Sequence, residues 1–178
     1  MAQAKRKKRF FDIEIPVINR ETQVQAYEIP ELGGRLIDYD MTRTLKGKSA
    51  MLQLKIKADG NNLTAVPVQL KILPYFLRRM MRKGTNYVED SFSAETKDAK
   101  VLIKPFLITR RKVSRSIRKS LRDRTREEIK KYLSERNSAG VFEDLVKNDF
   151  QRALGANLKK IYPLSFCEIR IFKVEKEK

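Results

Sequence analysis

Apolar and polar residues alternate along four stretches in the first half of the chain, with the period of two that is typical of half-buried β-strands. An Asp-Gly-Asn-Asn turn between the last two stretches predicts a hairpin, because these residues tolerate positive φ angles. Pro67 cannot donate a ladder hydrogen bond, so it predicts an edge position or a bulge in the returning strand. The predicted strands are residues 9–16, 35–41, 50–56 and 63–73, and residues 17–33 are predicted to be loop with one short strand.

The second half of the chain mixes helical and strand patterns. Residues 74–83 predict a short helix with an apolar face and a basic face, ended by Gly84. A longer helix is predicted up to about Arg136, and Asn148 with Gln151 matches the capping box of a later helix. The other predicted elements are strands at 86–96, 100–109 and 166–174 and helices at 142–148 and 150–161. A terminal strand has to pair with the earlier sheet, so the pattern predicts an α+β fold with a mixed sheet.

The size and charge of the chain add a partner to this picture. Its 178 residues suit one domain, and the 41% that are hydrophobic suffice for a core. We expect a basic N-terminal tail at 1–9 and a single α+β domain at 10–178. The net charge is +18, and self-repulsion of that size opposes the compact state, so a polyanionic partner is the simplest explanation.

Several classes of chemistry have no residues to support them. The chain has no histidine, which excludes His-based catalysis and, with only one cysteine, most zinc sites. The single cysteine, Cys167, cannot form an intrachain disulfide, which fits a reducing compartment. The stretch LKGKS resembles the end of a phosphate-binding loop, but Thr42 stands where that pattern needs its first glycine, so a polar turn is predicted. The paired acids are scattered on basic or solvated segments. We expect no catalytic residue, no metal site, no cofactor and no small-molecule substrate.

Basic residues are concentrated in three segments. On a helix from Val113, the aliphatic side chains of Val113, Ile117 and Leu121 share one face, and the basic side chains lie on the opposite face. Past Arg122 the pattern drifts, which predicts packing against two neighbours, and residues 127–136 also fit a solvated face. The predicted RNA-binding residues are Lys5, Arg6, Lys7, Lys8, Arg9, Arg78, Arg79, Arg82, Lys83, Arg110, Arg111, Lys112, Arg115, Arg118, Lys119, Arg122 and Arg126.

RNA is the polyanion that the sequence favours. Three aliphatic residues make too small a face for insertion into a membrane surface, and no apolar run approaches the ~18 residues of a membrane-spanning helix. The N-terminal basic segment is not followed by the apolar run of a secretory signal; a nuclear-type signal remains an alternative to a solvated or RNA-bound tail. No zinc-finger, zipper, homeodomain or RRM pattern appears. We therefore expect contacts made mainly to phosphates, with affinity that falls steeply with salt.

The order of motifs resembles one family of archaeal and eukaryotic small-subunit ribosomal proteins, known as S-three-A or e-S-one. The motifs are KKRFFDIEIP, GRLIDYDM, GNNLT, TKDAKVLIKPFLITRR and KKIYPLSFCEIRIFKV, over about residues 7–174. The resemblance implies a β-barrel-like α+β core and a cytoplasmic, ribosomal location on the platform near the messenger exit. It also implies small-subunit RNA and neighbouring ribosomal proteins as partners. Two features depart from the family pattern: Ala99 replaces the glycine of a KDG turn, and residues 71–83 are unusually apolar and basic.

The resemblance and the charge pattern together predict a structural constituent of the small ribosomal subunit, with the archaeal length. A free RNA chaperone or translation regulator, binding many RNAs with little preference, is the first alternative. An RNA-modifying or RNA-cleaving enzyme is the second, and the missing histidines argue against it.

Overall fold

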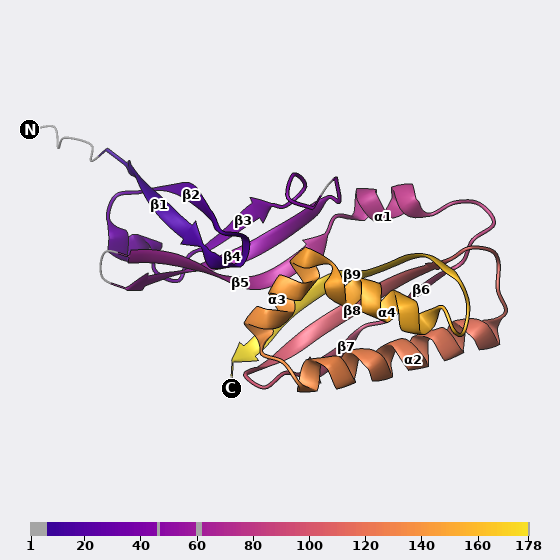
Figure 1. Cartoon of the computed structure of the whole chain (residues 1–178). Helices are drawn as coiled ribbons and strands as arrows, with labels where there is room; N and C mark the ends of the chain where they lie inside the picture. The colour runs from indigo at the N-terminus through magenta and orange to yellow at the C-terminus, as the bar shows by residue number, and fades with distance from the viewer. Residues whose placement is uncertain (1–6, 46, 60–61, 178) are drawn as a thin grey trace, which may run out of the picture.

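The first half of the chain forms strands, joined by loops and two short 3-10 helices (Figure 1). A computed structural model describes residues 7–45, 47–59 and 62–177. The 3-10 helices are η1 (Pro16–Ile18) and η2 (Ile29–Leu32). The strands are β1 (Arg9–Ile15), β2 (Arg20–Ala26), β3 (Leu36–Asp40), β4 (Ala50–Asp59) and β5 (Asn62–Ile72). The predicted hairpin is confirmed as β4 and β5, and the segment 17–33, predicted as loop with one short strand, contains β2.

The second half contributes the helices and the remaining strands. The helices are α1 (Pro74–Met80), α2 (Arg115–Ser134), α3 (Ser138–Lys147) and α4 (Asp149–Leu158). The strands are β6 (Tyr87–Glu89), β7 (Phe92–Glu95), β8 (Ala99–Thr109) and β9 (Leu164–Glu177). The single strand predicted at 86–96 is therefore two short strands. The predicted α+β class, with its long basic helix and terminal strand, is confirmed.

All these strands belong to one mixed sheet, which is open. Its central order is β2-β1-β5-β9-β8-β6, with β4 and then β3 branching from β5 and with β7 on β8. The β1–β5 pairing is parallel at Glu14 and Thr64, and the other pairings are antiparallel. Within the described ranges, β2 and β3 at one end and β6 and β7 at the other each pair with a single neighbour. The sheet is therefore not closed into the barrel that the family resemblance implied.

Strand β9 joins the two halves of the molecule. It pairs with β8 along the whole of Ala99–Thr109 and with β5 at Gln69–Lys71. Helices α3 and α4 lie over this part of the sheet, and α2 runs along β6 and β7 (Figure 1). The rings of Phe142 on α3 and Phe172 on β9 meet edge to face, with centroids 4.8 Å apart, at the centre of the core. The terminal strand thus organises the layer of helices as well as the sheet.

Helix α2 buries one row of side chains spaced by four. The row is Leu121, Thr125, Ile129 and Leu133, and it contacts α4 on one side and β6 and β7 on the other. Thr125 fits this apolar row because its hydroxyl donates to the Leu121 carbonyl at 2.6 Å. The predicted packing against two neighbours is confirmed. The helix begins at Arg115 after the Ser114 cap, so Val113 precedes it and the apolar row starts later than predicted.

Pro67 and Ala99 mark two positions where the sequence departs from regular strand or turn patterns. The β4–β5 register shifts between Gln53 and Leu54, opposite Pro67, so the predicted bulge is confirmed.

The turn at Ala99 forms without a positive φ angle there. Instead, buried Thr96 accepts a hydrogen bond from the Ala99 amide at 3.1 Å and donates to the Ala99 carbonyl at 2.8 Å. A threonine side chain therefore holds the turn in which a glycine was expected.

Two predicted helix ends are wrong. Helix α1 ends at Met80, and Met81 is already extended, so the positive φ of Gly84 lies beyond a short loop and does not end the helix. The predicted capping box of α4 does not form, because Asn148 adopts a left-handed conformation (φ 66°) between α3 and α4. The Gln151 amide donates instead to the Leu145 carbonyl at 3.0 Å.

Candidate nucleic-acid interface

Two basic segments that are distant in sequence meet around one hollow. Helix α1 with the loop after it, and the connection from β8 to α2, lie toward the end of the molecule opposite the N-terminus (Figure 1). Arg79 and Arg82 come from the first segment, Arg110 and Arg111 from the second, and all four are exposed. They line a hollow of about 760 Å³, which we call the arginine hollow. The fold thus concentrates charge that the sequence spreads over more than thirty positions.

Buried polar groups fix the backbone that carries Arg110 and Arg111. Thr109 is fully buried, and its hydroxyl lies 2.7 Å from the Arg111 carbonyl and 3.0 Å from the Asn86 carbonyl. The Asn86 side chain accepts from the Val113 amide at 2.8 Å. These bonds hold residues 110–113 against the loop before β6, so the two arginines are presented on a rigid support. Such preorganisation lowers the entropic cost of binding a ligand.

The four arginines of the hollow have no carboxylate partners among the described residues. Arginines elsewhere do: Arg124 pairs with Glu127 and Glu128 along α2, and Arg136 pairs with Asp144. Like charges that share one hollow repel one another, although solvent weakens the repulsion between exposed groups. An anion bound between them would remove this repulsion.

Two predicted RNA-binding residues of α2 are partly engaged by the protein itself. Arg126 makes a two-pronged contact with Asp90, with N–O distances of 2.8 and 3.1 Å, and its guanidinium lies 5.4 Å from the centre of the Phe92 ring. Arg118 is half-buried, and its Nε atom is buried without a hydrogen-bond partner. Arg126 therefore reaches toward β6 and β7, whereas the helical wheel put it opposite the apolar row, and RNA contact by either residue stays a prediction. Arg115, Lys119 and Arg122 are exposed, as predicted.

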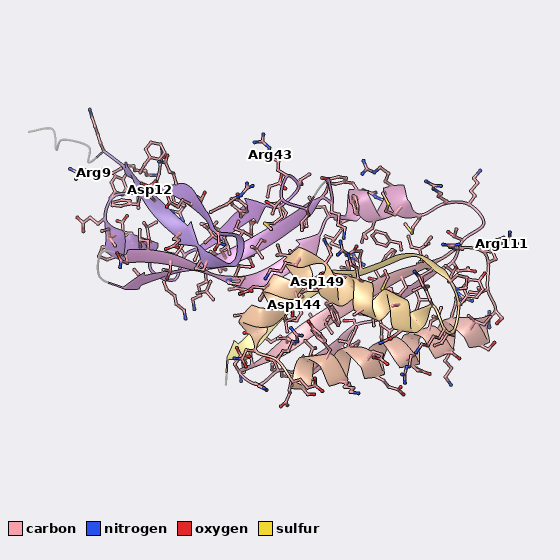
Figure 2. The ribbon with its side chains drawn as sticks, in the orientation of Figure 1. Arg9, Asp12, Arg43, Arg111, Asp144 and Asp149 are labelled. Atoms are coloured by element: carbon pink, nitrogen blue, oxygen red, sulfur yellow. The ribbon has the colours of Figure 1, made fainter. Side chains whose placement is uncertain are left out.

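The N-terminal basic residues form a separate surface. Lys5 and Arg6 lie outside the described residues, and Lys7, Lys8 and Arg9 are exposed. Figure 2 shows Arg9 at the opposite end of the molecule from Arg111. The remaining predicted residues, Arg78, Lys83 and Lys112, are exposed on the two segments that form the arginine hollow. The described members of the predicted set therefore reach from one end of the protein to the other.

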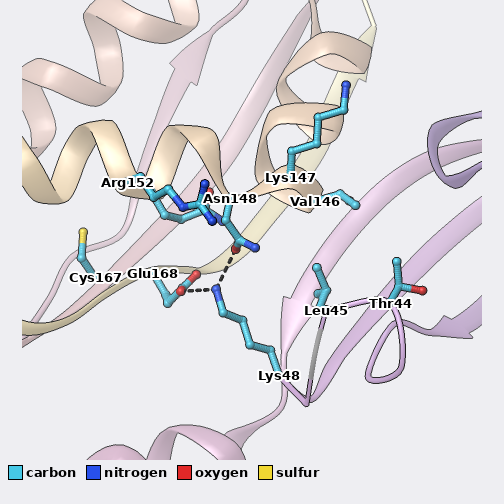
Figure 3. Close-up of a pocket in the computed structure, with 10 residues that line it drawn as sticks. Thr44, Leu45, Lys48, Val146, Lys147, Asn148, Arg152, Cys167 and Glu168 are labelled. Carbon is cyan, nitrogen blue, oxygen red and sulfur yellow. Dashed lines mark hydrogen bonds and ion pairs between the residues drawn. The ribbon is translucent and has the colours of Figure 1, made fainter.

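A second hollow, of about 420 Å³, was not predicted (Figure 3). There Lys48, from the loop before β4, forms an ion pair with Glu168 of β9 and donates to the Asn148 side chain at 2.6 Å. Burial is the largest effect on the Glu168 carboxyl and raises its pKa, and the hydrogen bond and charge of Lys48 offset only part of that rise. The sequence analysis had marked the LKGKS stretch around Lys48 as a polar turn, but no local pattern linked it to Glu168. These contacts join the N-terminal half to β9 and the α3–α4 junction.

The neighbouring thiol does not add catalytic chemistry to this second hollow. Burial, with a smaller effect of the Glu168 charge, raises the pKa of Cys167 to about 12. The thiol is therefore protonated at neutral pH and is a poor nucleophile or metal ligand. Over the described residues, no group of three or more Cys, Asp or Glu side chains is placed to hold a metal ion. No helix in the same part of the chain is long and apolar enough to cross a membrane.

Comparisons with known proteins agree with the resemblance seen in the motifs. The model of the Ribosomal S3Ae family matches residues 2–178. The small ribosomal subunit protein eS1 of Methanothermobacter thermautotrophicus is 30% identical over 122 residues, which cover 66% of this chain and 63% of that protein. The eS1 proteins of Nanoarchaeum equitans and Saccharolobus islandicus are 26% and 27% identical over 96% and 95% of this chain, and over 90% and 85% of their own lengths. The chain belongs to the Ribosomal S3Ae family.

Proposed function

We propose that this chain, which is a ribosomal protein and not an enzyme, binds the RNA of the small subunit through the arginine hollow and the adjoining start of α2. The single observation that carries the proposal is the group of four arginines without carboxylate partners. Guanidinium groups bind phosphate oxygens in a two-pronged geometry, so RNA phosphates would supply the missing counter-charge.

The start of α2 would extend this contact beyond the hollow. Arg115, Lys119 and Arg122 are exposed over the first two turns, and the helix rises about 10 Å between the first and the last of them. From about Arg124 onward, acids and bases pair with one another along the helix surface. We therefore place the RNA along the first part of α2 and not along its whole length.

The N-terminal basic surface would make a second, separate RNA contact. Its distance from the hollow suits a protein held between two RNA segments. By the family resemblance, we place the bound protein on the platform of the small subunit near the messenger exit, next to neighbouring ribosomal proteins. The structured domain at 10–178 would supply the main contact and the tail at 1–9 the second.

Sedimentation through sucrose gradients at two salt concentrations tests this proposal. At about 0.1 M salt the full chain should move with the small subunit, and at about 1 M salt, where screening is nearly complete, it should be released. A free RNA chaperone would instead exchange onto many RNAs at the lower salt and would not stay in the subunit peak. Protein found wholly at the top of the gradient at about 0.1 M salt would refute the proposal.

A further inference from the structure

We propose that the arginine hollow holds one unstacked nucleotide of the RNA, with the base inside and its flanking phosphates on the arginines. This inference rests on the proposed function and makes it more specific, because it states which form of RNA the hollow selects. The volume of about 760 Å³ lies within the ~300–1,000 Å³ of typical small-ligand sites.

The lining of the hollow includes a fixed aromatic ring. Phe166 and Met80 supply its apolar lining. The Phe166 ring is held by two other rings, those of Phe76 and Phe106, with centroids 6.2 and 6.4 Å away. Tyr87, which is 56% exposed, stacks on Phe106 and continues the aromatic cluster to the surface. RNA bases that have left the helix stack on aromatic rings of this kind.

The hydroxyl groups in the hollow are arranged to accept hydrogen bonds. Thr85 donates its hydrogen to the Arg82 carbonyl at 2.7 Å, and Ser165 donates its hydrogen to the Ile108 carbonyl at 3.2 Å. A hydroxyl has one hydrogen and two lone pairs, and here the hydrogen is already donated. Each oxygen can therefore only accept a hydrogen bond from a donor on an incoming ligand. The N–H groups on the edge of a base are such donors. The apolar lining and the two acceptors suit a base, and the cationic rim suits its flanking phosphates.

Paired RNA does not satisfy these groups. The bases of an A-form helix are stacked inside it, so a duplex can reach the arginines with its phosphates but cannot fill the apolar interior. A bulge or loop nucleotide can do both at once. The arginines come from two separate segments on the rim, which suits phosphates on either side of a single base.

Two matched RNA hairpins test the inference with the full-length protein. They share one stem, and one of them carries a single-nucleotide bulge made of the fluorescent base 2-aminopurine. At equal salt we expect the bulged hairpin to bind about 10-fold more tightly, as one stacked base predicts. The fluorescent base should also become protected from acrylamide quenching when it is bound.

A filling variant separates the hollow from the charge around it. Ser165→Leu adds bulk at an exposed position of the hollow and keeps every arginine; Ser93→Leu makes the same change at an exposed position on β7. We expect Ser165→Leu to bind the two hairpins equally, and Ser93→Leu to keep the preference for the bulge. Thermal melting checks that both variants fold.

The possible failures point to different conclusions. Equal binding of the two hairpins by the unmodified protein, or a preference that survives in Ser165→Leu, would overturn the inference and leave RNA binding by the arginines intact. No binding of either hairpin would remove the proposed function together with the inference.

Discussion

Replacing Arg79, Arg82, Arg110 and Arg111 together by Gln should remove most of the salt-dependent RNA affinity. If each arginine neutralises one phosphate, the slope of log K against log salt should fall in magnitude by about 3 to 4, since each contact contributes ~0.7 for single strands and ~0.9 for duplexes. If the variant and the unmodified protein bind RNA equally at about 1 M salt, the variant should bind roughly 200- to 1,000-fold more weakly at about 0.15 M salt. Fluorescence anisotropy with a labelled hairpin at several salt concentrations measures both quantities.

The chain offers a control with the same change in net charge. Arg124, Arg136, Lys147 and Arg152 are each paired with a nearby carboxylate. Replacing these four by Gln should change the slope by less than about one, because their charges are already balanced within the protein. Exposed pairs of this kind contribute ~0–1 kcal/mol each to the free energy of unfolding, so the control variant should still fold.

The comparison of the two variants decides the outcome. Circular dichroism should show both folded before any binding is measured. If the slope of log K against log salt falls as much in the control as in the variant of the arginine hollow, net charge alone governs RNA binding. That result would refute the reasoning from unpaired arginines.

Three further predictions concern the fold. Lys48→Met leaves the buried Glu168 carboxylate without its cation and should lower the free energy of unfolding in urea by about 3–5 kcal/mol, and Glu168→Gln in the same background should restore most of it. Cys167 should react slowly with thiol reagents at pH 8 in the native protein, because folding raises its pKa to about 12. The contribution of the neutral thiol to the free energy of unfolding is complete below the ordinary pKa of cysteine and is lost as pH rises above it. Asp98→Ala removes the carboxylate that accepts from the Ser138 amide at the start of α3, and should cost about 1 kcal/mol by thermal melting.

Each of these has an outcome that would contradict it. Equal stability of Lys48→Met and the unmodified protein would mean that Glu168 is solvated or neutral in both. Rapid labelling of native Cys167 would show that the thiol is accessible. Burial raises the pKa of Asp98, but the hydrogen bonds from Ser138 outweigh it and the pKa is lowered, so the stabilisation is present above the ordinary pKa and is lost as pH falls. A melting temperature independent of pH in that range would contradict the cap.

Local patterns in the sequence were enough for much of the fold. Alternation located the strands of the β4–β5 hairpin, and the missing amide of Pro67 located its bulge, because both depend on residues adjacent in sequence. The apolar row of α2 was only partly predicted. Thr125 belongs to it through a hydrogen bond to its own helix, which a scale of hydrophobicity does not register.

The arrangement of the candidate site depended on distant contacts. Arg126 was predicted to face RNA, and only the placement of α2 against β6 and β7 brings it to Asp90. The arginine hollow exists because residues 110–113 are tied to Asn86. No local rule predicts that contact, so the sequence identified the basic segments but not that two of them share one surface.

The position of β9 has a consequence for how the protein is made. Strand β9 lies between β5 and β8 in the sheet but follows both along the chain. While the chain emerges during synthesis, β8 has an unpaired edge rich in Val, Leu, Ile and Phe until residues 164–177 are available, and such edges recruit other chains. Pairings this distant in sequence also form slowly. We therefore expect newly made chains to aggregate readily in this interval, and bound RNA or a chaperone to increase the yield of folded protein.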